Sequence, residues 1–147
     1  MIQLREIKDI DLLMEWRAEV IRHVFGVSPG EGLLEANRRY YESHIADGSH
    51  VAYVAEYDGE KAGCGSICLT EELPSPDNPG GKCAYLMNIY VREPYREHGV
   101  GHAVVERLVA EAGRRGCGKI YLETTAEGRG LYESAGFRDL PDMMKLG

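Results

Sequence analysis

The chain has 147 residues and a formal net charge of −7, with 44% hydrophobic and 28% charged residues. That length is enough to bury a sizeable core, so we expect a single domain over residues 1–147. The acidic balance disfavours nucleic acid as a partner, because phosphate backbones attract basic surfaces. No run of about 18 apolar residues is present, so no membrane span is expected.

The N-terminus and the cysteines predict a cytoplasmic location. Charged residues at positions 5, 6, 8 and 9 interrupt any apolar leader, so no signal peptide is expected. None of the four cysteines shows the C-x-x-C spacing of a zinc site. We therefore expect free thiols in a reducing compartment, and no metal.

The first third of the chain predicts a strand and two helices. Residues 2–5 alternate in polarity, as a strand does. Asp9 is a plausible N-cap for a helix with apolar residues at helical spacing, which ends at Gly26. Residues 28–31 have the pattern of a capping box, which predicts a second helix ending at residues 47–48.

A β-hairpin is predicted next. Residues 50–57 are rich in Val, Ala and Tyr, and the Asp58-Gly59 pair that follows is a strong two-residue turn signal. The return strand is expected over residues 61–70. Gly63 and Gly65 interrupt it, which indicates a bulge or a close neighbour.

The central stretch reads as strand, glycine loop and helix. After a Pro- and Gly-rich loop over residues 71–82, an apolar strand is predicted from Tyr85 to Val91 and stops at Pro94. The loop Arg96–Gly101 then leads into a helical pattern from His102 to Ala112.

This arrangement is suited to holding phosphates. The first turn of a helix has unpaired N–H groups and a partial positive charge. Gly99 and Gly101 allow the backbone to approach an anion closely. The dinucleotide fingerprint needs a third glycine where Val104 stands, so that alternative is excluded.

The remaining elements complete a mixed sheet. A strand is predicted over residues 119–125, a short helix over 130–134, and a final strand from Phe137 onward, with residues 143–146 pairing back. Alternating strands and helices indicate an α/β fold of the α+β type.

Two segments resemble the GNAT superfamily of N-acetyltransferases. Arg96-x-x-Gly99-x-Gly101 after a strand is similar to its acetyl-CoA loop, and residues 130–137 resemble its second signature, a short helix with a tyrosine that ends at Gly-Phe. The resemblance implies a single GNAT-like domain with a central, mostly antiparallel sheet of about six to seven strands and about four helices. It also implies acetyl-CoA as co-substrate.

The resemblance further implies a set of site residues. The strand edge that would bind the pantetheine arm comprises Met87, Ile89, Tyr90 and Val91. The loop that would bind the diphosphate comprises Arg96, Glu97, His98, Gly99, Val100 and Gly101. Arg96 adds a charge or braces the loop, and a bulge is expected at Asn88 or Ile89. Tyr132 would contact the cofactor and serve as general acid.

The implied activity is transfer of an acetyl group to a primary amine of a small molecule or peptide. The base stays open among Glu71, Glu72, Glu123, His98 and a water chain. A non-catalytic acyl-CoA-binding domain is the alternative. Many members of this fold pair, so a homodimer also stays open. Candidates for the acceptor pocket lie at residues 25–28, Arg38, Tyr41, Tyr85 and residues 71–82.

Overall fold

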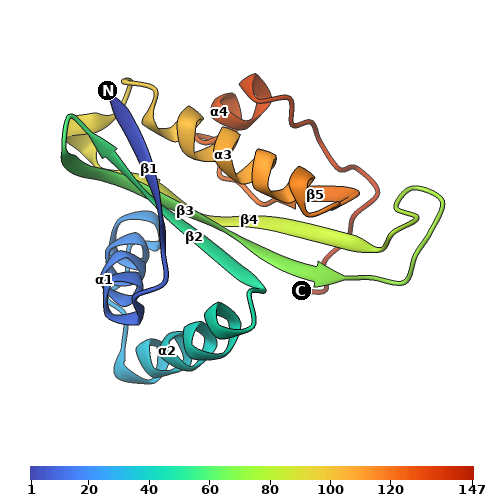
Figure 1. Ribbon diagram of the computed structural model, residues 1–147, viewed down its shortest axis with the longest axis horizontal. Helices are drawn as coiled ribbons and strands as arrows, with labels where there is room; N and C mark the ends of the chain where they lie inside the picture. Colours follow the sequence, from blue (N-terminus) through green and yellow to red (C-terminus); the bar gives the residue numbers. More distant parts are fainter.

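The computed structural model describes residues 1–147, in which two pairs of helices cover the two faces of one sheet (Figure 1). The strands are β1 (Ile2–Ile7), β2 (His50–Tyr57), β3 (Glu60–Glu71), β4 (Lys82–Val91) and β5 (Lys119–Leu122). The helices are α1 (Ile10–Val20), α2 (Glu31–Ala46), α3 (Val100–Arg114) and α4 (Arg129–Ser134), with a π-helical turn η1 (Ile21–Phe25) and a 3-10 turn η2 (Glu93–Tyr95). None of the helices combines the length and the apolar composition of a membrane span.

The sheet has the order β1-β2-β3-β4-β5, antiparallel throughout except for the parallel pair of β4 and β5. This confirms the predicted α/β class and the mixed, mostly antiparallel sheet. Four α-helices are present, as expected, but the five strands are fewer than the predicted six to seven.

The missing strands are those predicted at the C-terminal end. Residues 137–147 form no strand, either from Phe137 onward or over residues 143–146. Pro141 lacks the N–H that a sheet ladder needs, and Arg129 of α4 holds Asp139 in an ion pair. The side chain of Met144 is 96% exposed, so no apolar burial favours strand formation in this segment.

The predicted strand over residues 119–125 is also too long, because β5 ends at Leu122. The hydroxyls beyond it bond to local backbone instead of extending the sheet. Thr124 Oγ1 donates to the Thr125 carbonyl, and Thr125 Oγ1 accepts from the amide of Gly128 at 3.3 Å. These bonds favour a turn over further pairing.

The two N-terminal helices begin and end largely as their sequence indicates. The Asp9 carboxylate accepts from the Leu12 amide at 3.1 Å, and Gly26 ends the helical run in the left-handed region at φ 72°. The predicted capping box is wrong, because α2 begins at Glu31 after Gly30 and no side chain caps it.

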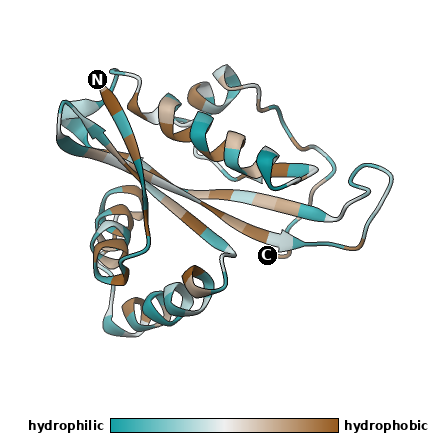
Figure 2. Ribbon diagram, in the orientation of Figure 1, coloured by the Kyte–Doolittle hydropathy of each residue, from teal (hydrophilic) through white to brown (hydrophobic).

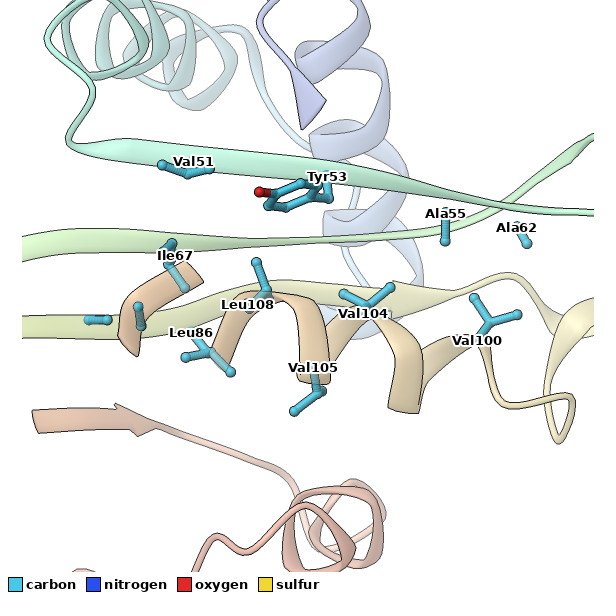
Figure 3. Packing of buried hydrophobic residues seen from close by; sticks show 12 residues of the cluster. Val51, Tyr53, Ala55, Ala62, Ile67, Leu86, Val100, Val104, Val105 and Leu108 are labelled. Atoms are coloured by element: carbon cyan, nitrogen blue, oxygen red, sulfur yellow. The ribbon is translucent and has the colours of Figure 1, made fainter. Parts of the chain in front are cut away.

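Two apolar clusters occupy the two faces of the sheet. On one face, Val104 and Leu108 of α3 point toward the sheet and pack with Ile67 of β3 (Figure 3). On the other face, Trp16 of α1 and Tyr41 of α2 are buried against β2 and β4. Figure 2 shows hydrophobic and hydrophilic residues alternating along these helices, as expected for helices that bury one side.

The structure confirms the predicted hairpin turn and the close approaches predicted at two glycines of its second strand. Asp58 and Gly59 both have positive φ, at 49° and 85°, as the predicted tight turn requires. Gly63 and Gly65 approach neighbours too closely for a Cβ, and the register of β3 against β4 shifts between Cys64 and Ser66.

Candidate active site

Strands β4 and β5 pair over half of β4 and then separate. The parallel ladder runs from the pair Cys83–Lys119 to the pair Leu86–Leu122. Beyond it, no strand pairs with residues 87–91 on the side away from β3. An unpaired strand edge can bind an extended, amide-containing ligand as though it were an additional strand.

A β-bulge lies at the point where the strands separate. Ser66 pairs with Met87 and Cys64 with Tyr90, so the two residues Asn88 and Ile89 lie opposite the single residue Gly65. Asn88 adopts the left-handed conformation, with φ 60°. The sequence left the bulge open between Asn88 and Ile89, and the structure shows that it contains both.

Hydrogen bonds across the bulge fix the direction of one amide. Cys64 Sγ donates to the Asn88 carbonyl at 3.3 Å, and Ser66 Oγ donates to the Met87 carbonyl at 3.1 Å. In a trans peptide the N–H points opposite to the carbonyl. The Ile89 N–H therefore points away from Cys64 and β3.

The glycine loop places a helix start at the end of β4. Gly99 is left-handed at φ 85°, and α3 begins at Val100 without a side-chain cap. The first helical bond runs from the Ala103 amide to the Gly99 carbonyl at 3.0 Å. The preceding amides have no intrahelical acceptor and face any anion placed at this end. A Cβ on Gly101 would contact Leu131 of α4 at 3.2 Å, so α4 lies beside this helix start.

Two side chains of the loop make contacts within the protein. Arg96 Nε donates to the Val91 carbonyl at 3.0 Å, which braces the loop against the end of β4. His98 Nδ1 lies 2.7 Å from the Arg96 carbonyl, and its ring contacts Tyr57 edge-on. Glu97 is left-handed at φ 64° and exposed. Of the two roles left open for Arg96, the structure shows the brace.

Tyr132 lies on α4, one residue from the contact with the helix start. Its half-buried ring packs edge-on against Phe137, with the ring centres 6.0 Å apart. Burial raises the pKa of the Tyr132 phenol above its ordinary value, so the hydroxyl stays protonated at neutral pH. The same side chain lines a cavity of about 670 Å³ along the outer edge of β5.

Two of the expected cofactor residues direct their side chains into the core. Tyr90 is buried against Trp16 and stacks on His23, and Val100 is buried among the α3 residues. Each can offer only its backbone to a ligand. Met87 and Ile89 are half-buried, and Met87 Sδ lies 3.2 Å from Cys68 Sγ.

The sheet face that carries α1 and α2 has a second group of polar residues beside the separation. Tyr85 and Tyr121 are paired in register with their ring centres 5.0 Å apart. Glu123 directly follows the end of β5, and its carboxylate lies near the Tyr85 side chain. Burial, and after it the nearby Glu123 carboxylate, raise the pKa of Tyr85 to about 12.

The structure separates the other candidate bases from this position. Glu72 forms an ion pair with Lys119 at 3.2 Å and accepts a hydrogen bond from Asn78. His98 belongs to the glycine loop, and Glu71 is exposed at the end of β3. Glu123 alone lies beside Tyr85.

One functional candidate was missed by sequence reasoning. Arg17 of α1 donates from Nη1 to Asn88 Oδ1 at 2.8 Å and from Nε to Asn37 Oδ1 at 3.0 Å. Nothing in the sequence marks this arginine, because its partners come from α2 and from the bulge. Arg38, another candidate for the acceptor pocket, forms an ion pair with Asp11.

The four cysteines are free: Cys64 and Cys83 are buried, and Cys68 and Cys117 are half-buried. No group of three or more His, Cys, Asp or Glu side chains is arranged to hold a metal ion.

Comparison with known proteins identifies the family. Residues 14–137 match the sequence model of the "Acetyltransferase (GNAT) family". The chain belongs to the GNAT family of acetyltransferases. A GNAT acetyltransferase is an acyltransferase enzyme, and the open strand edge and glycine loop of this chain lie within the matched residues.

Two similar proteins are named as N-acetyltransferases. The chain is 31% identical over 128 residues to glucosamine 6-phosphate N-acetyltransferase 1 of Oryza sativa subsp. japonica, covering 82% of this chain and 76% of that protein. It is 29% identical over 97 residues to thialysine N-epsilon-acetyltransferase of Sus scrofa, covering 51% of this chain and 57% of that protein.

Solved structures share the GNAT fold. A predicted acetyltransferase from Clostridium acetobutylicum, crystallised with acetyl-CoA, superposes with a TM-score of 0.89 at 28% identity, covering 100% of this chain and 96% of that one. A GCN5-related N-acetyltransferase from Ralstonia eutropha JMP134 superposes with a TM-score of 0.80 at 27% identity, covering 99% and 98% of the two chains.

Proposed function

We propose that this GNAT protein transfers the acetyl group of acetyl-CoA to a primary amine by direct attack. The observation that carries the proposal is the outward-pointing Ile89 amide at the bulge, on a strand edge that leads to an uncapped helix start. A donor for an oxyanion and a site for a diphosphate are thus connected by one open strand.

Acetyl-CoA would lie along this arrangement from end to end. The diphosphate of acetyl-CoA would accept hydrogen bonds from amides between Glu97 and Gly101, where the helix dipole also favours negative charge. The pantetheine arm would follow the open edge of residues 87–91, pairing with its backbone as a strand does. The thioester would then lie at the bulge.

The chemistry needs three groups. The neutral amine nitrogen attacks the thioester carbon, and the negative charge on the carbonyl oxygen is stabilised by the Ile89 N–H. When the intermediate collapses, the carbon–sulfur bond breaks and the Tyr132 hydroxyl donates its proton to the departing thiolate. The attacking nitrogen then releases its extra proton, and this proton restores the Tyr132 phenol. The products are the acetylated amine and CoA.

We assign to Glu123 the role of binding the acceptor amine and taking up its proton. Its carboxylate lies near the Tyr85 side chain. A carboxylate there would bind the ammonium form of the acceptor and take up the proton that leaves before attack. The relatives named for glucosamine 6-phosphate and thialysine support a small-molecule amine as substrate.

Thiol release tests the proposal. The protein is incubated with acetyl-CoA and pools of primary amines, and free CoA is followed with a thiol reagent. We expect amine-dependent release that falls roughly 100-fold or more in Tyr132→Phe, since general acid catalysis contributes about 10²–10⁴-fold. Tyr53→Phe is the matched control, because the Tyr53 hydroxyl is buried against Glu111 of α3.

The same experiment separates catalysis from binding alone. CoA that binds in calorimetry without thiol release for any amine pool would favour a non-catalytic acyl-CoA-binding domain. Unchanged turnover in Tyr132→Phe would remove Tyr132 from the role of general acid.

A further inference from the structure

Arg17 is the one arginine that is neither exposed nor ion-paired. Seven others lie within 4.0 Å of a carboxylate: Arg5, Arg38, Arg39, Arg92, Arg114, Arg115 and Arg129. Four more are exposed to solvent: Arg22, Arg96, Arg107 and Arg138. Arg17 is half-buried, and no carboxylate lies within that distance. An arginine withdrawn from water usually has an anionic partner.

The guanidinium is nevertheless held firmly in place. Asn37 of α2 and Asn88 of β4 each accept one of its N–H groups, at 3.0 and 2.8 Å. Its central carbon also lies 5.8 Å from the centre of the Phe25 ring. Four elements therefore fix this side chain: α1, α2, β4 and the π-turn η1.

Neutral amides fix the direction of the guanidinium without cancelling its charge. An arginine side chain has five N–H donors, and these two bonds use only two of them. The planar fork suits a carboxylate or a phosphate, which can accept two parallel bonds. The arrangement is that of an oriented anion site.

Arg17 lies next to the bulge, where the proposed function would place the acetyl group. Asn88 directly precedes Ile89, so the guanidinium lies within one asparagine side chain of the backbone at the bulge. The Glu123 carboxylate lies near the Tyr85 side chain, across the separation of β4 and β5. One positive group near Asn88 and one negative group near Tyr85 thus lie along the same stretch of β4.

Three exposed apolar side chains belong to the segments that follow Arg17. Phe25 is 64% exposed and Val27 is 56% exposed, and both belong to the connection between α1 and α2. Leu33 on the first turns of α2 is 48% exposed, and its carbonyl accepts a hydrogen bond from Asn37. Side chains of this kind can cover the carbon skeleton of a bound small molecule.

We propose that Arg17 binds an anionic oxygen group on the acceptor, so that the substrate is an amine that also carries a carboxylate or a phosphate. The inference rests on the proposed function and specifies its substrate class. Glu123 receives the ammonium end, and Arg17 receives the anionic end.

Matched amine pairs test this inference. An amino acid is compared with its carboxamide, and an amino-sugar phosphate with the unphosphorylated amino sugar, in steady-state kinetics with acetyl-CoA. We expect kcat/KM to favour the anionic member of at least one pair by roughly 10- to 100-fold, as for a charge-assisted hydrogen bond. The pair that shows the preference tells a carboxylate from a phosphate.

Variants assign the preference to Arg17. Arg17→Gln should remove the discrimination mainly through KM, Arg17→Lys should restore part of it, and the affinity for CoA should not change. Arg39→Gln is the matched control, because Arg39 lies on α2 and pairs with Glu35 at the surface. Thermal melts of each variant establish that it folds.

Acceptor binding to the protein–CoA complex, measured by calorimetry, decides the inference even without turnover. Anionic members that bind no better than neutral ones would overturn it. The inference would also be overturned if Arg17→Gln lowered the affinity for both members of a pair equally. Arg17 would then only support the structure of the bulge. Absence of thiol release for all amines, with the binding preference intact, would contradict the proposed function alone.

Discussion

Gly65 and Val104 lie so close together that a Cβ built on Gly65 would stand 2.5 Å from Cγ1 of Val104. The same Cβ would stand 3.2 Å from Ile89 Cγ1 and from Leu108 Cδ1. Strand β3 thus approaches α3 directly opposite the bulge. This contact links the position of the candidate oxyanion donor to the packing of α3, the helix whose start is the proposed diphosphate site.

Gly65→Ala should therefore destabilise the protein and disturb the bulge. Forcing an added methyl group against Val104 typically lowers the free energy of unfolding by about 1–3 kcal/mol. This exceeds the small entropic gain of replacing a glycine. We expect a lower midpoint in urea unfolding and reduced acetyl transfer. Gly113→Ala is the control, because a Cβ there meets nothing within 4 Å and alanine favours the helix by up to about 1 kcal/mol. Equal stability of the two variants would contradict this reading of the contact.

Glu97 should weaken CoA binding. It places a carboxylate in the loop that would hold the diphosphate, and its φ of 64° is strained for a residue with a Cβ. Glu97→Gly and Glu97→Gln should each tighten CoA binding by roughly 3- to 10-fold at low salt, less at high salt, because the repulsion is screened. Calorimetric titration measures this, with Glu106→Gln farther along α3 as the control. Unchanged affinity in both Glu97 variants would place the diphosphate away from this loop.

His50 should make the protein sensitive to mild acid. The ring is 5% exposed, its Nδ1 lies 2.9 Å from the Tyr40 hydroxyl, and its Nε2 has no partner. The rings of Tyr40 and Tyr41 and the Cys68 thiol surround it, with the charges of His44 and Arg17 nearby. Burial, followed by these charges, lowers the pKa of His50 to about 4.

The direction of the effect follows from proton binding. The unfolded state takes up a proton near pH 6.5 and the folded state only near pH 4, so folding stability falls as the pH falls through that window. At pH 5 the loss from this group is roughly 2 kcal/mol. The free energy of unfolding in urea should fall less between pH 7 and pH 5 in His50→Gln than in the wild type. In the control His102→Gln, which changes an exposed histidine, it should fall as much as in the wild type. The same drop in His50→Gln would assign the acid sensitivity to other groups.

Glu123→Gln tests the assignment of the amine site. Loss of the carboxylate should lower kcat/KM for amines roughly 100-fold near neutral pH, with a smaller deficit at high pH where the amine is already neutral. CoA affinity should stay unchanged. Glu127→Gln, in the exposed turn before α4, is the matched control. If the ratio of kcat/KM in Glu123→Gln to that in the wild type does not change with pH, Glu123 is excluded as the group that takes up the proton.

Local sequence signals predicted the elements whose causes are themselves local. Asp9 caps α1, Asp58-Gly59 makes the hairpin, and Gly63 and Gly65 mark close approaches. The glycine loop was likewise predicted from its own residues, although α3 begins at Val100, two residues earlier than expected.

Features that depend on distant partners were not readable. The alternation over residues 143–146 suggested a strand, but no other strand lies against it and its side chains stay exposed. The direction of the Ile89 amide depends on Cys64, which is 24 residues from Asn88 along the chain. Arg17 was missed for the same reason, since its significance lies in the absence of a carboxylate near it in space.

The central claim is that backbone amides at the start of α3 hold the diphosphate of the coenzyme. Calorimetric titration with CoA and with pantetheine, which lacks the diphosphate and the nucleotide, tests it most directly. We predict that CoA binds at least about 100-fold more tightly, as expected for a doubly charged anion at a helix start. Equal affinity for the two ligands, or no binding of CoA at all, would contradict the account.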